Sequence, residues 1–122
     1  MNSIRSLGIV FVAVCLLLGP APLHAGAKRA LPQGVIREGS LCNQKLLFDA
    51  SVAAAGKLAQ MGHTYDPKRH SFQPYVVSLP QGAPGERRWT ERWIYSVDGK
   101  EIPITIDFRE AGAGAADYTI RR

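Results

Sequence analysis

The sequence predicts an α+β domain in which one helix packs on a four-stranded antiparallel meander. One stretch of helical periodicity precedes several stretches of alternating apolar residues, and a hairpin-turn signal, Asp98-Gly99, separates two of these. The 122 residues are enough for one domain. With 46% hydrophobic and 20% charged residues, the composition excludes collagen-like, low-complexity and fully disordered chains.

Residues 1–25 have the pattern of a secretory signal peptide. Arg5 supplies a positive charge, and the apolar run over 7–18 is shorter than the ~20 residues that a membrane-spanning helix requires. Small residues ending at Ala25 or Ala27 form cleavage triplets. We therefore expect a periplasmic or secreted protein with no stable membrane anchor after cleavage.

The expected mature chain begins with an extended N-terminal segment, residues 26–39, which is rich in glycine, proline and basic residues. Within it, Val35-Ile36 has the residue types of a short strand. A single α+β domain is expected over residues 40–122.

Apolar residues spaced by three and four predict a helix over about 42–61, with the stripe Leu47, Ala50, Ala54, Leu58 and Met61. Ser40 or Asn43 can cap its start, and Gly62 stands where a left-handed residue ends a helix. Gly56 inside the helix weakens it, so we expect close packing on the sheet to compensate.

After a polar connection over 63–71, alternating residues predict four strands. Their apolar members are Tyr75, Val77 and Leu79; Trp89, Trp93, Tyr95 and Val97; Ile102, Ile104, Ile106 and Phe108; and Tyr118 and Ile120. A two-residue turn at Asp98-Gly99 pairs Val97 with Lys100 and brings the large apolar groups of both strands to one face. In the last pairing, Phe108 faces Tyr118 and Arg109 faces Asp117.

Cleavage of the signal would remove Cys15 and leave Cys42 as a single thiol in an oxidising compartment. Two alternatives follow for such a cysteine. We expect a buried thiol at the start of the helix, because free cysteine is among the most buried residue types. A disulfide-linked homodimer through Cys42 is the second alternative.

Glu91 is the one carboxylate that the strand parity places on the apolar face, opposite Ile106. A buried acid must be paired, hydrogen-bonded or neutral. We expect a structural ion pair with Lys45, Lys57 or Arg87, and we keep a binding or catalytic acid in an aromatic-lined groove as the alternative.

His63 and His70 flank Asp66 and are suitable zinc ligands by type. Lys68 and Arg69 beside them disfavour a cation, and no fourth ligand is evident, so no metal site and no cofactor are expected. The sequence also has no Gly-x-Ser-x-Gly, His-Glu-x-x-His or phosphate-binding glycine loop.

Arg88, Arg92 and Arg109 are expected on the outer face of the hairpin, where they form a candidate binding surface. Glu91, on the apolar face, is a further candidate binding residue. A formal net charge of +5 is modest, and the aromatic residues are needed in the core, so nucleic acid is not an expected partner. An anionic envelope component, such as lipopolysaccharide head groups or acidic glycans, suits this charge better.

The strand Trp89-Thr-Glu-Arg-Trp93, the Asp98-Gly99 hairpin and the strand Ile104-Thr-Ile-Asp-Phe108 resemble small signal-bearing bacterial proteins of unknown function. The resemblance covers residues 87–121 and implies an exported α+β domain without a catalytic residue. A helix across an antiparallel meander is also similar to the cystatin-like fold by analogy, although the Gln-x-Val-x-Gly loop of cystatins is absent.

These observations favour an exported, non-enzymatic binding protein of the bacterial envelope, with another protein or an envelope component as its partner. One alternative is a small extracytoplasmic hydrolase or transferase that uses Cys42, His63, His70 or Glu91. Another is an inhibitor or toxin-neutralising protein, which fits the size of the chain.

Overall fold

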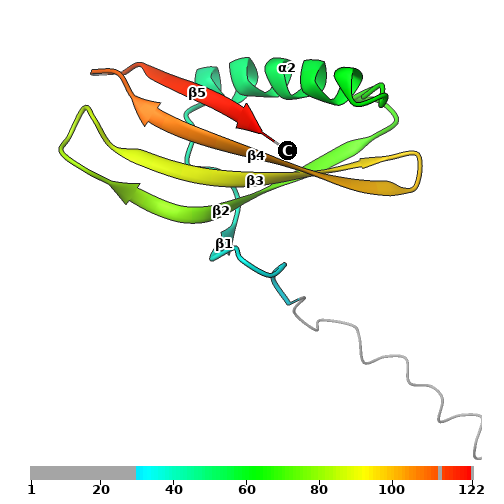
Figure 1. Cartoon of the computed structure of the whole chain (residues 1–122), viewed down its shortest axis with the longest axis horizontal. Helices are drawn as coiled ribbons and strands as arrows, with labels where there is room; N and C mark the ends of the chain where they lie inside the picture. The colour runs from blue at the N-terminus through cyan, green and yellow to red at the C-terminus, as the bar shows by residue number, and fades with distance from the viewer. Residues whose placement is uncertain (1–29, 113, 122) are drawn as a thin grey trace, which may run out of the picture. The chain divides into compact units, whose positions relative to one another are not determined.

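The computed structural model describes residues 30–112 and 114–121. Over these residues one helix crosses one face of an antiparallel sheet whose strands follow chain order, β1-β2-β3-β4-β5 (Figure 1). The elements are β1 (Arg37–Glu38), α2 (Gln44–Gln60), β2 (Ser71–Gln81), β3 (Arg88–Val97), β4 (Lys100–Glu110) and β5 (Ala116–Arg121). The predicted α+β fold is confirmed, with the two-residue β1 as a fifth strand. The predicted signal peptide lies outside the described residues.

Helix α2 has the expected boundaries to within two residues. The Asn43 side chain caps it by accepting a hydrogen bond from the Leu46 amide at 2.8 Å. Beyond the helix, Gly62 adopts φ +91°, and the His63 amide donates to the Leu58 carbonyl at 2.8 Å. The buried side of the helix carries Leu46, Ala50, Ala54 and Leu58.

The expectation for Gly56 is wrong. This glycine lies on the exposed side of α2, and a Cβ atom placed on it would meet no atom of residues 30–112 and 114–121 within 4 Å. Packing on the sheet therefore does not explain why glycine stands in the middle of this helix.

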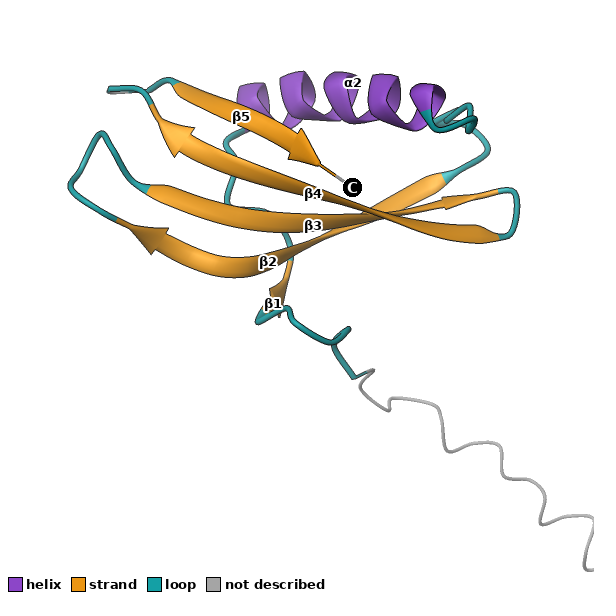
Figure 2. Ribbon diagram, in the orientation of Figure 1, coloured by secondary structure: helices purple, strands orange, loops and turns teal. Residues whose placement is uncertain are grey.

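The register predicted for β3 and β4 is confirmed. Val97 pairs with Lys100, Trp93 with Ile104 and Trp89 with Phe108. Asp98 and Gly99 adopt φ 49° and 81°, the two positive values that a type I′ turn requires. The large apolar groups of both strands consequently share the face that α2 covers (Figure 2), here called the inner face.

Strand β5 also pairs as predicted: Phe108 lies opposite Tyr118, Ile106 opposite Ile120 and Arg109 opposite Asp117. Tyr118 reaches the helix, where its hydroxyl donates to the Asp49 carbonyl at 3.3 Å. The edge strand is therefore attached both to β4 and to α2.

The face predicted for β2 is wrong. Val76 is fully buried opposite Glu91, whereas Leu79 is 53% exposed. The pairing with β3 is irregular between Val76 and Ser78, and such a bulge shifts the alternation by one residue. The strand also starts earlier than expected, at Ser71, so that Phe72 stacks on Tyr95 with ring centroids 4.9 Å apart.

Residues 31–41, here called the N-terminal strap, pass around the edge of β2. The Ile36 amide donates to the Val76 carbonyl at 2.8 Å, and the Gly39 amide donates to the Pro74 carbonyl at 2.9 Å. The short strand lies at Arg37–Glu38 and not at the expected Val35-Ile36.

Candidate functional site

The carboxylate of Glu91 lies at the centre of the inner face and is fully buried, as the strand parity predicted. Its Oε1 accepts hydrogen bonds from the Ser40 hydroxyl at 2.7 Å and from Trp93 Nε1 at 2.8 Å. Its Oε2 accepts from the Leu41 amide at 2.8 Å and from Trp89 Nε1 at 2.9 Å. Four donors therefore satisfy both oxygens.

The expected ion pair of Glu91 is wrong. Among the described residues no Lys, Arg or His lies within 4.0 Å of the Glu91 carboxylate, so neither Lys45 nor Lys57 nor Arg87 is its partner. The Trp-x-Glu-x-Trp pattern instead places two indole donors on either side of one acceptor, which in turn holds the end of the N-terminal strap. The geometry makes Glu91 an anchor within the core.

Cys42 lies beside this anchor, with Sγ 3.9 Å from Glu91 Oε2. The pKa of the Cys42 thiol is raised to about 12, mainly by burial and in smaller part by the neighbouring Glu91 carboxylate. Since the thiolate is the nucleophile, a thiol with this pKa reacts slowly at neutral pH. The side chain is half-buried, close to the buried thiol that we expected.

His70 lies at another part of the domain and has no free ring nitrogen. Its Nδ1 accepts from the Asp66 amide at 2.9 Å, so Nε2 carries the proton and donates to Asp98 Oδ1 at 3.0 Å. The ring ties the connection before β2 to the β3–β4 turn. In the part of the chain that the structure describes, no three His, Cys, Asp or Glu side chains are grouped as metal ligands.

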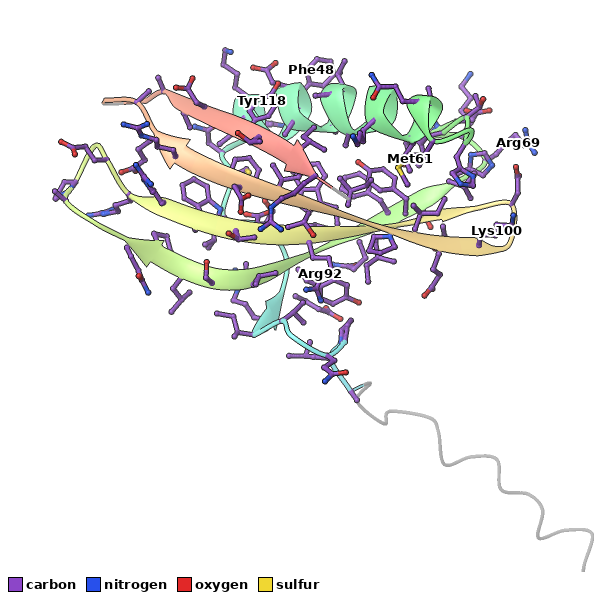
Figure 3. All side chains as sticks on the ribbon, in the orientation of Figure 1. Phe48, Met61, Arg69, Arg92, Lys100 and Tyr118 are labelled. Atoms are coloured by element: carbon purple, nitrogen blue, oxygen red, sulfur yellow. The ribbon has the colours of Figure 1, made fainter. Side chains whose placement is uncertain are left out.

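The opposite side of the sheet, here called the outer face, carries the arginines in two different settings. Arg92 contacts the N-terminal strap. Its Nη1 donates to the Gln33 carbonyl at 2.7 Å, and its guanidinium lies against Gly34. Figure 3 shows Arg92 on the side of the sheet away from the helix, next to the segment before β1. Arg88 and Arg109 pair directly across β3 and β4 and are both exposed.

Arg88 and Arg109 line a groove of about 880 Å³, here called the outer groove. Its other polar side chains include Ser78, Gln81, Thr90 and Asp117. Within the described residues, no carboxylate lies within 4.0 Å of either arginine. The groove therefore presents two guanidinium groups that form no salt bridge with the rest of the described chain.

Asp107 is one of two acidic residues that line the outer groove, and it forms an ion pair with Arg121. Arg121 Nε donates to its Oδ2 at 2.7 Å, and the Thr90 hydroxyl donates to its Oδ1 at 2.7 Å. The hydrogen bond from Arg121 holds the pKa of Asp107 below its usual range. Sequence reasoning assigned no role to this pair, although the register of the last two strands placed residues 107 and 121 near each other.

The predicted candidate residues thus separate into three places. Cys42 and Glu91 meet in the core, His70 binds the hairpin turn, and Arg88 and Arg109 share the outer groove. No family model, curated protein or solved structure matches this chain. Within residues 30–112 and 114–121 there is also no helix of the length and apolarity that crossing a bilayer demands.

Proposed function

We propose that this chain is an exported, non-enzymatic binding protein that holds an anionic group of an envelope component in the outer groove. The observation that carries the proposal is the direct cross-strand pairing of Arg88 with Arg109. Like charges in this position destabilise a sheet, and an anion between them would remove that cost. Guanidinium groups suit carboxylate or phosphate oxygens, which they bind with two parallel hydrogen bonds.

The charges around the arginines support the same ligand chemistry. Asp107 is paired with Arg121. Asp117 lies opposite Arg109 in the register of β4 and β5 but forms no salt bridge with it among the described residues, so one carboxylate stands against two arginines in the groove. Ser78 and Thr90 offer hydroxyl groups beside them. A negatively charged, hydroxyl-rich group such as a phosphorylated sugar matches these donors.

The alternative of an enzyme has little support in the geometry of its candidate residues. The Cys42 thiol has a raised pKa, Glu91 is enclosed by donors, and both nitrogens of His70 are engaged. Among the described contacts neither histidine bonds to Cys42, and the Glu91 carboxylate 3.9 Å from its Sγ raises the pKa of the thiol. A binding role needs none of these groups.

The test measures binding to phosphatidylcholine vesicles with and without phosphatidic acid, whose head group is a phosphate monoester. Wild type is compared with the double variant R88Q/R109Q, and K68Q/K100Q serves as a control with the same loss of charge. Losing one charge-assisted contact costs ~1.5 kcal/mol, about a tenfold loss of affinity.

We expect R88Q/R109Q to lose binding by at least that factor and K68Q/K100Q to lose much less. Equal losses in the two double variants would reduce the effect to net charge and contradict a specific site. Binding that is unchanged in R88Q/R109Q would remove the outer groove as the ligand surface.

A further inference from the structure

Helix α2 exposes two large apolar side chains on the face turned away from the sheet. Phe48 is 67% exposed and Val52 is 57% exposed. The two residues are four positions apart and so lie on one row along the helix. Figure 3 shows Phe48 on the side of α2 that points away from the strands.

Gly56 is the next residue of the same row, and the described residues give no structural reason for it. Its φ is not in the left-handed region, and a Cβ there would meet none of the described atoms within 4 Å. A glycine inside a helix costs ~1 kcal/mol relative to alanine. What the glycine does provide is a notch in the exposed surface, one turn beyond Val52.

We propose that this row is a self-association surface, on which two copies of the chain pair through antiparallel α2 helices. The spacing 48, 52, 56 is symmetric about Val52. A two-fold axis through Val52 therefore places Phe48 of each copy over Gly56 of the other, and Val52 against its own equivalent. The Phe48 ring of each copy then fills the notch at Gly56 of the other, so the same contact forms twice, as an isologous interface requires.

The charges on this face agree with an antiparallel second copy. The Lys45 side chain is 84% exposed and forms an ion pair with Asp49 at 2.9 Å. Under the same two-fold, position 45 lies opposite position 59 of the second copy, in the last turn of its helix. The C-terminal end of a helix carries negative partial charge, which attracts the lysine. Lys57, the basic residue of that turn, is half-buried and lies outside the row 48, 52 and 56. A parallel pairing would instead set Lys45 against Lys45.

The available area predicts a transient dimer. A helix of 17 residues is about 25 Å long and about 10 Å wide. The area that one face of such a helix can bury is less than the ~800 Å² per partner of a standard interface. Both outer grooves stay accessible, because α2 and the outer face lie on opposite sides of the sheet. The inference is therefore independent of the proposed function.

Sedimentation velocity of the mature chain over a range of concentrations, up to roughly millimolar, tests the proposal. The key variants are G56F, which fills the notch, and F48A/G56F, which exchanges the large and small positions. Both variants should fold, because position 56 is exposed and phenylalanine favours a helix more than glycine does. Circular dichroism verifies that their helix content is retained. L79S removes an apolar side chain that is 53% exposed on β2 and serves as the control.

We expect wild type and L79S to dimerise at high concentration, G56F to dimerise about tenfold more weakly or not at all, and F48A/G56F to recover dimerisation. A surface that is merely apolar would associate most strongly in G56F, and that result would overturn the proposal. A wild-type chain that stays monomeric at every concentration would overturn it as well, and would leave another protein or a lipid surface as the occupant of this face.

Discussion

The Glu91 carboxylate lies in the core with no cationic side chain of the described residues within 4.0 Å, and its environment shows how this is tolerated. Burying a carboxylate is costly unless hydrogen bonds replace its hydration. The indoles of Trp89 and Trp93 and the groups of Ser40 and Leu41 provide four such bonds, all between 2.7 and 2.9 Å. Since each donor has few other acceptors at this depth, the carboxylate and its donors depend on one another.

Glu91→Gln should therefore destabilise the protein strongly. The amide replaces one acceptor oxygen with an NH₂ group, which cannot accept a hydrogen bond from an indole or a backbone amide. We expect a loss of ~2–4 kcal/mol in the free energy of unfolding, measured by urea denaturation.

Glu101→Gln, at an exposed position of β4, is the matched control and should change stability by less than ~0.5 kcal/mol. Anion binding in the outer groove should persist in folded Glu91→Gln. A variant as stable as wild type would contradict the role of Glu91 as an anchor.

At the scale of elements, β3 and β4 carry two unrelated sets of residues on their two faces. Trp89, Trp93 and Phe108 form the core on the inner face, whereas Arg88 and Arg109 meet solvent on the outer face. Because a strand alternates with a period of two, one register fixes both sets together. A single turn at Asp98-Gly99 thus positions the core and the groove.

The Asp107–Arg121 pair joins β4 to β5 on the outer face and should titrate in acid. The folded-state pKa of Asp107 lies below the ordinary value of ~3.9 for an aspartate. The contribution of the pair to the free energy of unfolding is therefore present above about pH 4 and is lost as the pH falls through the lowered pKa. In Arg121→Gln the pKa of Asp107 should rise toward the ordinary value. Thr90→Val should raise it by less, because that hydrogen bond is the smaller cause.

Nuclear magnetic resonance of the Asp107 carboxyl carbon as a function of pH measures these values directly. A pKa of Asp107 that is the same in wild type and in Arg121→Gln would show that the pair is absent in solution.

At the scale of the whole domain, the N-terminal strap connects the two faces of the sheet. Arg92 holds Gln33 on the outer face, and Glu91, the preceding residue of β3, holds Ser40 on the inner face. Between these two contacts the strap pairs with β2 and covers part of its free edge. Such coverage protects an edge strand from pairing with other chains.

Removing residues up to Gly39 should weaken the domain without unfolding it. The deletion breaks the backbone bonds to Pro74 and Val76 and the bond from Arg92 to Gln33. It leaves the donors from residues 40 and 41 on Glu91. We expect a loss of ~2 kcal/mol in the free energy of unfolding, with the β3–β4 register unchanged in amide chemical shifts. A deletion that abolishes folding would show that the strap is part of the core, and one without effect would show that it is not docked.

Where the pattern of the chain is local, the sequence was sufficient to predict the structure. The period of α2 and the pairing across Asp98-Gly99 follow from neighbouring residues, because helix and hairpin geometry depend on short separations. Of the two predicted cap candidates, Ser40 and Asn43, the structure selects Asn43. The same parity placed Glu91 in the core and Arg88 beside Arg109.

Tertiary structure decided what lies across long separations. The donors to Glu91 from Ser40 and Leu41 are about 50 residues away in sequence, and no local pattern indicates them. The bulge after Val76 and the open space around Gly56 likewise depend on what packs nearby. Alternation and turn chemistry thus determine the elements of this protein from its sequence alone. The partners of a buried charge and the uncovered side of a helix are determined only when distant segments meet in three dimensions.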